Sequence, residues 1–280
     1  RRPGRRGGGG TGLSRRRRLD VELVRRGLVG SRSSAQALIA AGRVTVDGAS
    51  ADKAARLVDP AQAVVVVGPP ARYVSRGGQK REAALDRFGI AVEGCRAIDV
   101  GSSTGGFTDC LLHRGAVSVV ALDVGRGQLH QKLRDDTRVD VHERTNVRGV
   151  DPGGLGGPFD LLVADLSFIS LRTVMEQLLS LVSEGASMVL LVKPQFEAMR
   201  QEVGRGGVVK DPTIHARVLA RVILWTVNSG FRLRDLTPSP ILGDAGNREF
   251  LLLLENGPQR QPLPKAGGEA LGGSEDSRVL

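Results

Sequence analysis

IDVGSSTGGF, at residues 98–107, carries the strongest structural signal in this sequence. An apolar strand over residues 97–100 runs into a glycine-rich loop, and a helix is expected to begin near Gly105. Glycines in such a loop allow the backbone to approach a ligand at the carboxyl end of the strand. The stretch therefore predicts the first strand, turn and helix of a nucleotide-binding α/β sheet.

The residues around this loop favour a nucleotide without phosphates. The glycine spacing is G-x-x-x-G-G rather than the G-x-G-x-x-G that binds a pyrophosphate, and the sequence has no Walker-type Gly-Lys-Ser/Thr. Asp99 precedes the loop, where its charge opposes a phosphate but suits a cation. Asp123 ends the next expected strand, 22 residues beyond Gly101, where a carboxylate can bind two ribose hydroxyls. S-adenosylmethionine has those hydroxyls, an ammonium and a sulfonium but no phosphate, so we predict this methyl donor as the cofactor.

The predicted donor site combines these carboxylates with the loop and with Asn146, which follows the third expected strand and could meet the adenine edge. An ordinary loop asparagine is the alternative interpretation of Asn146. The residues of the predicted site are Asp99, Gly101, Ser103, Gly105, Gly106, Asp123 and Asn146.

Strands alternate with helical segments from Arg72 onward, which indicates a parallel sheet with crossover connections. The later strands include FDLLVAD at 159–165, SMVLLVKP at 187–194 and REFLLLLE at 248–255. We therefore predict an α/β fold for the larger part of the chain: a Rossmann-like sheet with helices on both faces.

A smaller unit precedes this sheet. Two short segments, 19–28 and 31–42, have helical periodicity, with Ser31 as the expected cap of the second. RVTVDG then turns at Asp47-Gly48, and VVVV at 64–67 supplies a further strand. This pattern predicts a small α+β domain. The predicted organisation is a disordered Arg/Gly-rich arm at 1–17, the small domain at 18–68, a linker at 69–78, the large domain at 79–256 and a flexible tail at 257–280.

The basic character of the chain is concentrated in its first residues. Eight of the 40 Lys and Arg residues lie within residues 1–18, which contain no acid, so with 30 Asp and Glu the other 262 residues carry only +2. This arm could bind phosphates or could be a solvated extension. The two cysteines lack the spacing of a disulfide scaffold or a zinc site, and no run of about 18 apolar residues occurs. We predict a reducing, cytoplasmic setting, no metal and no membrane association.

Four charged residues are expected around one cleft. Asp165, Lys193 and Glu249 lie at strand ends on the side of the glycine loop, and Lys80 lies in the helix that precedes the first strand. Each residue alone has a structural explanation, such as a helix cap or a solvated strand end. Their joint position at the cleft predicts a functional site.

Two parts of the chain resemble known families. Residues 18–48, including Arg18-Leu19-Asp20 and Asp47-Gly48, resemble the S4 RNA-binding domain. From about Arg18 onward the chain resembles the TlyA family, whose larger domain is an FtsJ-like class I methyltransferase. The strings that carry this resemblance are SRGGQK (75–80), DVGSSTGGFTD (99–109), ALDVGRGQL (121–129), ERTNVR (143–148), ADLSFISL (164–171), LVKPQFE (191–197), GGVVKDP (206–212) and GNREF (246–250).

The resemblance implies an enzyme that methylates the 2'-hydroxyl of cytidine in ribosomal RNA, in the large subunit and in some members also in the small subunit. It implies S-adenosylmethionine as cofactor, ribosomal RNA or ribosomal subunits as partner, and a monomer. Matched to the Lys-Asp-Lys-Glu tetrad of the family, the catalytic residues are Lys80, Asp165, Lys193 and Glu249. One departure is Tyr73, where the family pattern leads us to expect Trp.

The tetrad suits a ribose hydroxyl, because an alcohol is a poor nucleophile that needs a base and in-line alignment. Lys193, beside the charge of Lys80, could lose its proton near neutral pH and accept that of the hydroxyl. Asp165 and Glu249 would orient the lysines and the ribose. No metal is required, since the leaving group is neutral. The fourth strand ends in ADLSF rather than the Asn/Asp-Pro-Pro-aromatic string of amine methylation, and neither cysteine is expected in the cleft.

Contacts with RNA are expected from the helix pair of the small domain and from residues 196–212, a long connection that follows Lys193. The predicted RNA-binding residues are Arg18, Arg25, Arg26, Arg32, Arg43, Arg200 and Arg205. Two other functions stay open: a non-catalytic ribosome-assembly factor, against which the complete tetrad argues, and a membrane-active haemolysin, which the lack of an apolar span disfavours.

Overall fold

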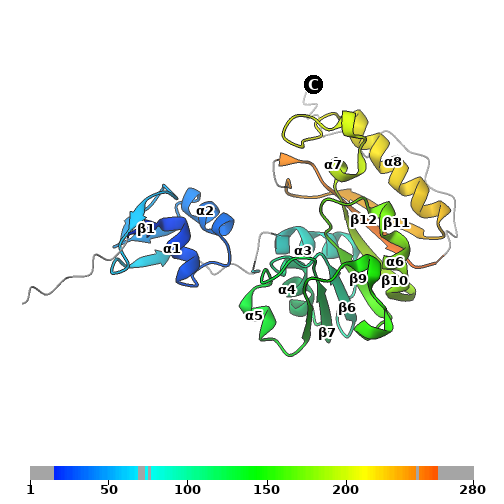
Figure 1. Cartoon of the computed structure of the whole chain (residues 1–280), viewed down its shortest axis with the longest axis horizontal. Helices are drawn as coiled ribbons and strands as arrows, with labels where there is room; N and C mark the ends of the chain where they lie inside the picture. Colours follow the sequence, from blue (N-terminus) through cyan, green and yellow to red (C-terminus); the bar gives the residue numbers. More distant parts are fainter. Residues whose placement is uncertain (1–15, 69–72, 75–76, 244–245, 258–280) are drawn as a thin grey trace, which may run out of the picture. The chain divides into compact units, whose positions relative to one another are not determined.

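The computed structural model describes residues 16–68, 73–74, 77–243 and 246–257, and the chain divides into two compact units, residues 1–79 and 80–280 (Figure 1). The predicted arm and tail lie almost wholly outside the described residues, as does most of the predicted linker. Tyr73 is described and is 4% exposed. A Cβ added at Gly78 would lie 2.3 Å from the Cβ of Tyr73. The tyrosine therefore packs so closely against residue 78 that this residue must be a glycine.

The first unit packs two short helices, α1 (Leu19–Arg25) and α2 (Arg32–Ala40), against small strands. Ser31 caps α2 as predicted, since its Oγ accepts a 3.1 Å hydrogen bond from the N–H of Ser34. The strands are β1 (Arg17–Arg18), β2 (Val44–Val46), β3 (Ala49–Ser50), β4 (Leu57–Val58) and β5 (Val64–Val66). β2 lies antiparallel between β3 and β5, and β1 pairs with β4. This is the predicted small α+β domain.

The second unit is built on a seven-stranded sheet. In chain order its elements are α3 (Gly77–Phe88), β6 (Arg96–Val100), α4 (Gly106–His113), β7 (Ser118–Leu122), α5 (Gln131–Arg134), β8 (Val139–His142), the 3₁₀ turns η1 (Val147–Gly149) and η2 (Gly153–Leu155), β9 (Phe159–Ala164), η3 (Leu171–Thr173), α6 (Met175–Ser180), β10 (Val182–Val192), α7 (Pro194–Glu197), η4 (Arg200–Glu202), α8 (Pro212–Asn228), β11 (Arg232–Pro238) and β12 (Phe250–Glu255).

The strand order is β11-β12-β10-β9-β6-β7-β8. The five strands from β10 to β8 pair in parallel, whereas β12 is antiparallel to both β10 and β11. Because β12 runs against its neighbours, its first residue lies beside the last residue of β10, with Phe250 opposite Val192. One end of the sheet therefore gathers the carboxyl ends of the parallel strands and the start of β12.

An aliphatic core covers one face of this sheet, as expected for a chain with only 3% aromatic residues. Alternate strand residues such as Ile98, Leu162 and Leu190 pack with Leu178 of α6 and Val222 of α8. On the other face, α4 contacts β6 and β7 (Figure 1). Each fully buried side chain of this size contributes roughly 1.5–3 kcal/mol relative to exposure. The predicted Rossmann-like sheet with helices on both faces is thus confirmed.

The long connection between β10 and α8 contains the short helices α7 and η4. Glu202 of η4 forms ion pairs with two arginines of α8, at 3.5 and 3.0 Å. Asn247, just before β12, accepts a hydrogen bond from the N–H of Val209 and donates one to the carbonyl of Gly207, both at 3.0 Å. The connection is therefore fastened to α8 and to the segment that precedes β12.

Candidate active site

Three of the predicted catalytic residues lie on neighbouring strands at the same end of the sheet. Asp165 follows β9, Lys193 follows β10 and Glu249 precedes β12. The pairing of Val192 with Phe250 places Glu249 next to Lys193 in the register of the two strands. The three residues cluster because β9, β10 and β12 are adjacent in the sheet, although they are far apart in sequence.

Two oxygen atoms hold the amine of Lys193. Its Nζ lies 2.7 Å from Oδ1 of Asp165 and donates a 2.8 Å hydrogen bond to Oγ of Ser167. The side chains of Lys193 and Asp165 are 12% and 18% exposed, so the pair is shielded from bulk water without being sealed from it. At this distance and degree of burial, the charge-assisted contact fixes the direction of the lysine side chain.

Glu249 is 3% exposed and lies under the backbone of Gly243. A Cβ added at Gly243 would lie 2.0 Å from Oε1 of Glu249, so a larger residue at this position would displace the carboxylate. Lys80, the fourth member of the predicted tetrad, belongs to α3, but its side chain is outside the described part of the chain. Of the predicted tetrad, two members are therefore in direct contact and a third is adjacent in register.

The glycine loop after β6 lies against the catalytic end of β9. Gly101 has a φ of +83°, and a Cβ added there would lie 2.6 Å from the carbonyl oxygen of Asp165. Ser103 and Gly105 also have positive φ, at 49° and 92°. Glycine adopts this left-handed conformation without strain, whereas it is uncommon for other residues. The loop thus places the predicted donor site and the predicted catalytic residues side by side.

Asp123, at the end of β7, holds two loops together through its carboxylate. Oδ2 accepts a 2.8 Å hydrogen bond from the N–H of Ser103, and Oδ1 accepts one of 2.6 Å from the N–H of Gly125. Each carboxylate oxygen has a further lone pair, so Asp123 can accept hydrogen bonds from two ribose hydroxyls and still hold the loops. The contact with a ribose stays a prediction.

Asp99 and Asn146 have structural roles that their positions in the sequence did not reveal. Asp99 is fully buried, and its Oδ2 accepts hydrogen bonds from the N–H and Oγ1 of Thr108, at 2.9 and 2.8 Å, which fix the first turns of α4. Asn146 is exposed and caps η1 through a 3.1 Å hydrogen bond from the N–H of Arg148. Gly106 is the first residue of α4. Contacts of these residues with a methyl donor stay predictions.

A fully buried carboxylate, Asp20, organises two of the predicted RNA-binding arginines. It accepts hydrogen bonds from Arg18 at 3.0 and 3.1 Å, from Arg32 at 2.9 Å and from Gln36 at 3.0 Å. The hydrogen bond from Arg18 is the main reason that the pKa of Asp20 lies well below its ordinary value. The guanidinium groups of Arg18 and Arg32 are therefore held in fixed positions.

Glu22 does the same for the next two arginines. It is fully buried and accepts hydrogen bonds from Arg25 at 2.8 and 2.6 Å and from Arg26 at 2.7 Å. The hydrogen bond from Arg25 is the main cause that lowers the pKa of Glu22 to about 2. Asp20 lies in the string Arg18-Leu19-Asp20 that carries the S4 resemblance, but neither acid was predicted as a functional residue. The available signal was the short string RLDVELVRR, in which two acids lie among arginines at the start of a helix.

The other predicted RNA-binding arginines lie elsewhere. Arg43 donates a 2.9 Å hydrogen bond to the carbonyl of Val67 in the first unit. Arg200 begins η4, and Arg205 follows it before α8; both are exposed. Contacts of these three residues with RNA stay predictions.

Residues next to the tetrad that were not predicted as site residues complete the site. Phe168 is 92% exposed with a φ of +65°, and its ring centroid lies 5.2 Å from that of Phe196. Glu197 is 5% exposed, and its carboxylate accepts hydrogen bonds of 2.6 Å from Oγ of Ser170 and from the N–H of Leu171. Burial raises the pKa of Glu197 against the effect of these hydrogen bonds. The available sequence signal was that these residues lie in the strings ADLSFISL and LVKPQFE, close after Asp165 and Lys193.

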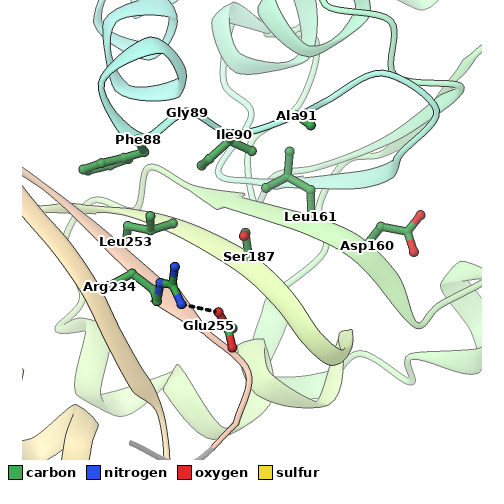
Figure 2. A pocket seen from close by; sticks show the side chains of 10 residues that line it. All are labelled: Phe88, Gly89, Ile90, Ala91, Asp160, Leu161, Ser187, Arg234, Leu253 and Glu255. Atoms are coloured by element: carbon green, nitrogen blue, oxygen red, sulfur yellow. Dashed lines mark hydrogen bonds and ion pairs between the residues drawn. The ribbon is translucent and has the colours of Figure 1, made fainter. Parts of the chain in front are cut away.

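A cavity of about 310 Å³ lies at the opposite end of the sheet. It is lined by the end of α3, by Asp160 and Leu161 at the start of β9, and by Ser187 of β10 (Figure 2). Arg234 of β11 points toward Glu255 of β12, with a hydrogen bond of 3.1 Å between them (Figure 2). The lining includes none of the predicted catalytic or donor-site residues.

Within the described ranges, no helix combines the length and the apolar character needed to cross a membrane. Among the same residues, no three His, Cys, Asp or Glu side chains are grouped so that they could bind a metal ion.

The family matches and the individual relatives of this chain agree with one another. Residues 73–256 match the family of FtsJ-like methyltransferases, and residues 17–64 match the S4 domain. The 16S/23S rRNA (cytidine-2'-O)-methyltransferase TlyA of Mycobacterium tuberculosis is 51% identical over 243 residues, which cover 86% of this chain and 91% of that protein. Hemolysin A of Brachyspira hyodysenteriae is 40% identical over 235 residues, with coverage of 84% and 98%.

A solved structure extends these matches to the fold. That structure, of a hemolysin candidate from Streptococcus thermophilus, is 40% identical, covers 92% of this chain and 95% of its own, and superposes with a TM-score of 0.74. The family match spans every strand end at which the candidate site is built. The chain therefore belongs to the FtsJ-like methyltransferase family, as a TlyA-type member with an S4 domain ahead of its methyltransferase domain.

Proposed function

We propose that this protein transfers a methyl group from S-adenosylmethionine to the 2'-hydroxyl of a cytidine in ribosomal RNA. The observation that carries the proposal is the contact between Lys193 and Asp165 directly beside the glycine loop, where Gly101 approaches the backbone of Asp165. A base next to a methyl-donor loop is the arrangement that an alcohol nucleophile needs. The names of the M. tuberculosis relative and of other relatives supply the substrate class.

The residues of the second unit fit the donor. Asp123 offers two carboxylate oxygens for the ribose hydroxyls, and the left-handed residues Gly101, Ser103 and Gly105 form the tight turn that brings the loop to the end of β7. Asp99 steadies this loop through α4. When bound, S-adenosylmethionine supplies an electrophilic methyl group whose transfer leaves a neutral thioether, so no metal is needed to stabilise a leaving charge.

Lys193 accepts the proton of the 2'-hydroxyl in this mechanism. In its neutral form the amine has two N–H bonds and one lone pair, and the hydroxyl oxygen forms its new bond to the methyl carbon as the proton moves to Nζ. Asp165, at 2.7 Å, then stabilises the ammonium ion that results. Glu249 lies next in register, where its carboxylate can orient the ribose or a second lysine. We propose Lys80 as that second lysine.

Features outside the tetrad support an RNA substrate. The ring of Phe168 is almost fully exposed beside Asp165 and rests on Phe196, so it offers a face on which a base can stack. In the first unit, the buried carboxylates hold four arginines in place, as binding to phosphates requires. We propose that the S4 domain binds ribosomal RNA and that the second unit modifies it.

The proposal is tested by incubating the full chain with radiolabelled S-adenosylmethionine and ribosomal subunits that lack the modification. Label should appear in the RNA with the wild-type protein and be lost with Asp165→Asn. Asp160→Asn, five residues earlier on the same strand and at its opposite end, is the matched control and should behave as wild type. Absence of label from both subunits, with a protein shown to bind the donor, would contradict the proposed function.

A further inference from the structure

We infer that Ser167 is a positioning residue for methyl transfer, one that aims the lone pair of Lys193 at the substrate hydroxyl; this inference rests on the proposed function. The hydroxyl of Ser167 is the second oxygen within hydrogen-bond distance of Nζ of Lys193, at 2.8 Å, beside the carboxylate of Asp165 at 2.7 Å. The family tetrad does not include this serine.

The geometry follows from the number of N–H bonds on the amine. A neutral lysine has two N–H bonds and one lone pair at a tetrahedral nitrogen. Ser167 accepts one N–H, and the carboxylate of Asp165 attracts the other from an ion-pair distance of 2.7 Å, so the lone pair points away from both oxygens. Without Ser167, one N–H is free to rotate and the lone pair has no fixed direction. The serine thus contributes to rate through orientation rather than through contact with the substrate.

The turn that carries Ser167 is held firmly against α7, the helix that follows Lys193. The carboxylate of Glu197 accepts hydrogen bonds of 2.6 Å from Ser170 and from the N–H of Leu171. The ring of Phe168 packs on Phe196 of the same helix. These contacts fix the distance between the turn after β9 and α7. Ser167 is therefore held within hydrogen-bond distance of Lys193.

The positive φ of Phe168, +65°, supports the same conclusion. A bulky residue rarely adopts this conformation, which costs about 1–3 kcal/mol and persists only where surrounding contacts impose it. The backbone turns sharply directly after Ser167, and this turn lets the segment double back onto α7. Ser167 itself is exposed, so removing its hydroxyl leaves no buried polar group of its own turn unpaired.

The test is single-turnover methyl transfer to unmodified ribosomal subunits at saturating donor. Ser167→Ala should lower the rate constant about tenfold, the value of one lost directional hydrogen bond, while the Kd values for S-adenosylmethionine and for the subunits stay within about twofold of wild type. Ser167→Thr keeps the hydroxyl and should recover most of the rate. Ser170→Ala removes a hydroxyl of the same turn that contacts Glu197 and not Lys193, and should cost less than about threefold because Leu171 keeps its hydrogen bond.

Four outcomes would overturn the inference. These are a Ser167→Ala rate equal to wild type, equal losses in Ser167→Ala and Ser170→Ala, a parallel loss of donor affinity, and a failure of Ser167→Thr to recover the rate. The proposed function is judged separately, by the wild-type protein. If wild type transfers no methyl group to ribosomal RNA, the proposed function fails before any serine variant is compared.

Discussion

Nζ of Lys193 lies 2.7 Å from Oδ1 of Asp165, across two adjacent parallel strands whose carboxyl ends lie at the same edge of the sheet. The two residues are separated by the whole of η3, α6 and β10 in the chain. Their contact depends on the parallel pairing of β9 with β10, which carries both strand ends to the glycine loop after β6. The fold therefore places Lys193, its carboxylate partner Asp165 and the predicted donor loop close together.

Lys193→Ala should reduce methyl transfer by about 100-fold or more while leaving the fold intact, because it removes the only proposed proton acceptor at a strand end outside the apolar core. Asp165→Ala should have a similar effect. The measurement is single-turnover methylation, with circular dichroism to confirm folding. Activity of folded Lys193→Ala above about a tenth of wild type would remove Lys193 from the role of base.

Asp123→Ala should weaken binding of S-adenosylmethionine by at least about tenfold, since charge-assisted hydrogen bonds to ribose are lost and the Ser103 and Gly125 loops are released. Calorimetric titration of the full chain measures this Kd directly. Asp140→Ala, an exposed residue of β8, is the matched control. Equal affinities in the two variants would show that the donor does not bind at the end of β7.

The residues at the strand ends could be predicted from the sequence. The hydrogen bonds that hold the segments around them could not. An apolar run lies directly beside each of Asp165, Lys193 and Glu249. The sequence therefore predicts that all three lie at the ends of strands. Ser167 and Glu197 are different, because their partners lie 26 or 27 residues away on another element. Such contacts depend on how α7 packs against the turn after β9, which no local pattern encodes.

The buried acids of the S4 domain illustrate a second limit of prediction from the sequence, which is the burial of charged side chains. Asp20 and Glu22 have an ordinary appearance in the first turn of a helix, where acids are common. Their complete burial results from the arginines and from α2 closing over them. Asp99, predicted from its position to face a cationic ligand, is also fully buried, and its Oδ2 accepts two hydrogen bonds from Thr108 that its position did not reveal. Burial of a charge is decided by tertiary packing rather than by position in the chain.

Arg32→Ala should weaken binding to ribosomal RNA severalfold and make binding less sensitive to salt, because each lost phosphate contact lowers the slope of log K against log salt by about 1. Its side chain is 57% exposed and its guanidinium is held by Asp20, which suits contact with a phosphate. Filter binding over a salt series measures both effects. Arg234→Ala, beside the cavity in Figure 2, is the control. An unchanged salt slope for Arg32→Ala would count against a phosphate contact.

Glu22 should make the stability of the S4 domain depend on acid pH. Its pKa is lowered to about 2 in the folded chain from an ordinary value of 4.5. A lowered carboxyl pKa stabilises the fold above the unfolded value, and this contribution is lost as the pH falls from about 4.5 toward 2. Hydrogen exchange of peptides from residues 17–66, corrected for intrinsic rates, should show Glu22→Gln less protected than wild type at pH 7, with a clearly smaller difference at pH 3. A difference that persists unchanged at pH 3 would contradict this linkage.

The proposed function is tested most directly by identifying the atom of the RNA that carries the new methyl group. Unmodified ribosomal subunits are incubated with the full chain and S-adenosylmethionine, and the RNA is digested to nucleosides for mass spectrometry. The account predicts 2'-O-methylcytidine with wild type, and none above background with Lys193→Ala. Methylation on a cytosine ring atom or amine would contradict it, as would equal yields of 2'-O-methylcytidine from the two proteins.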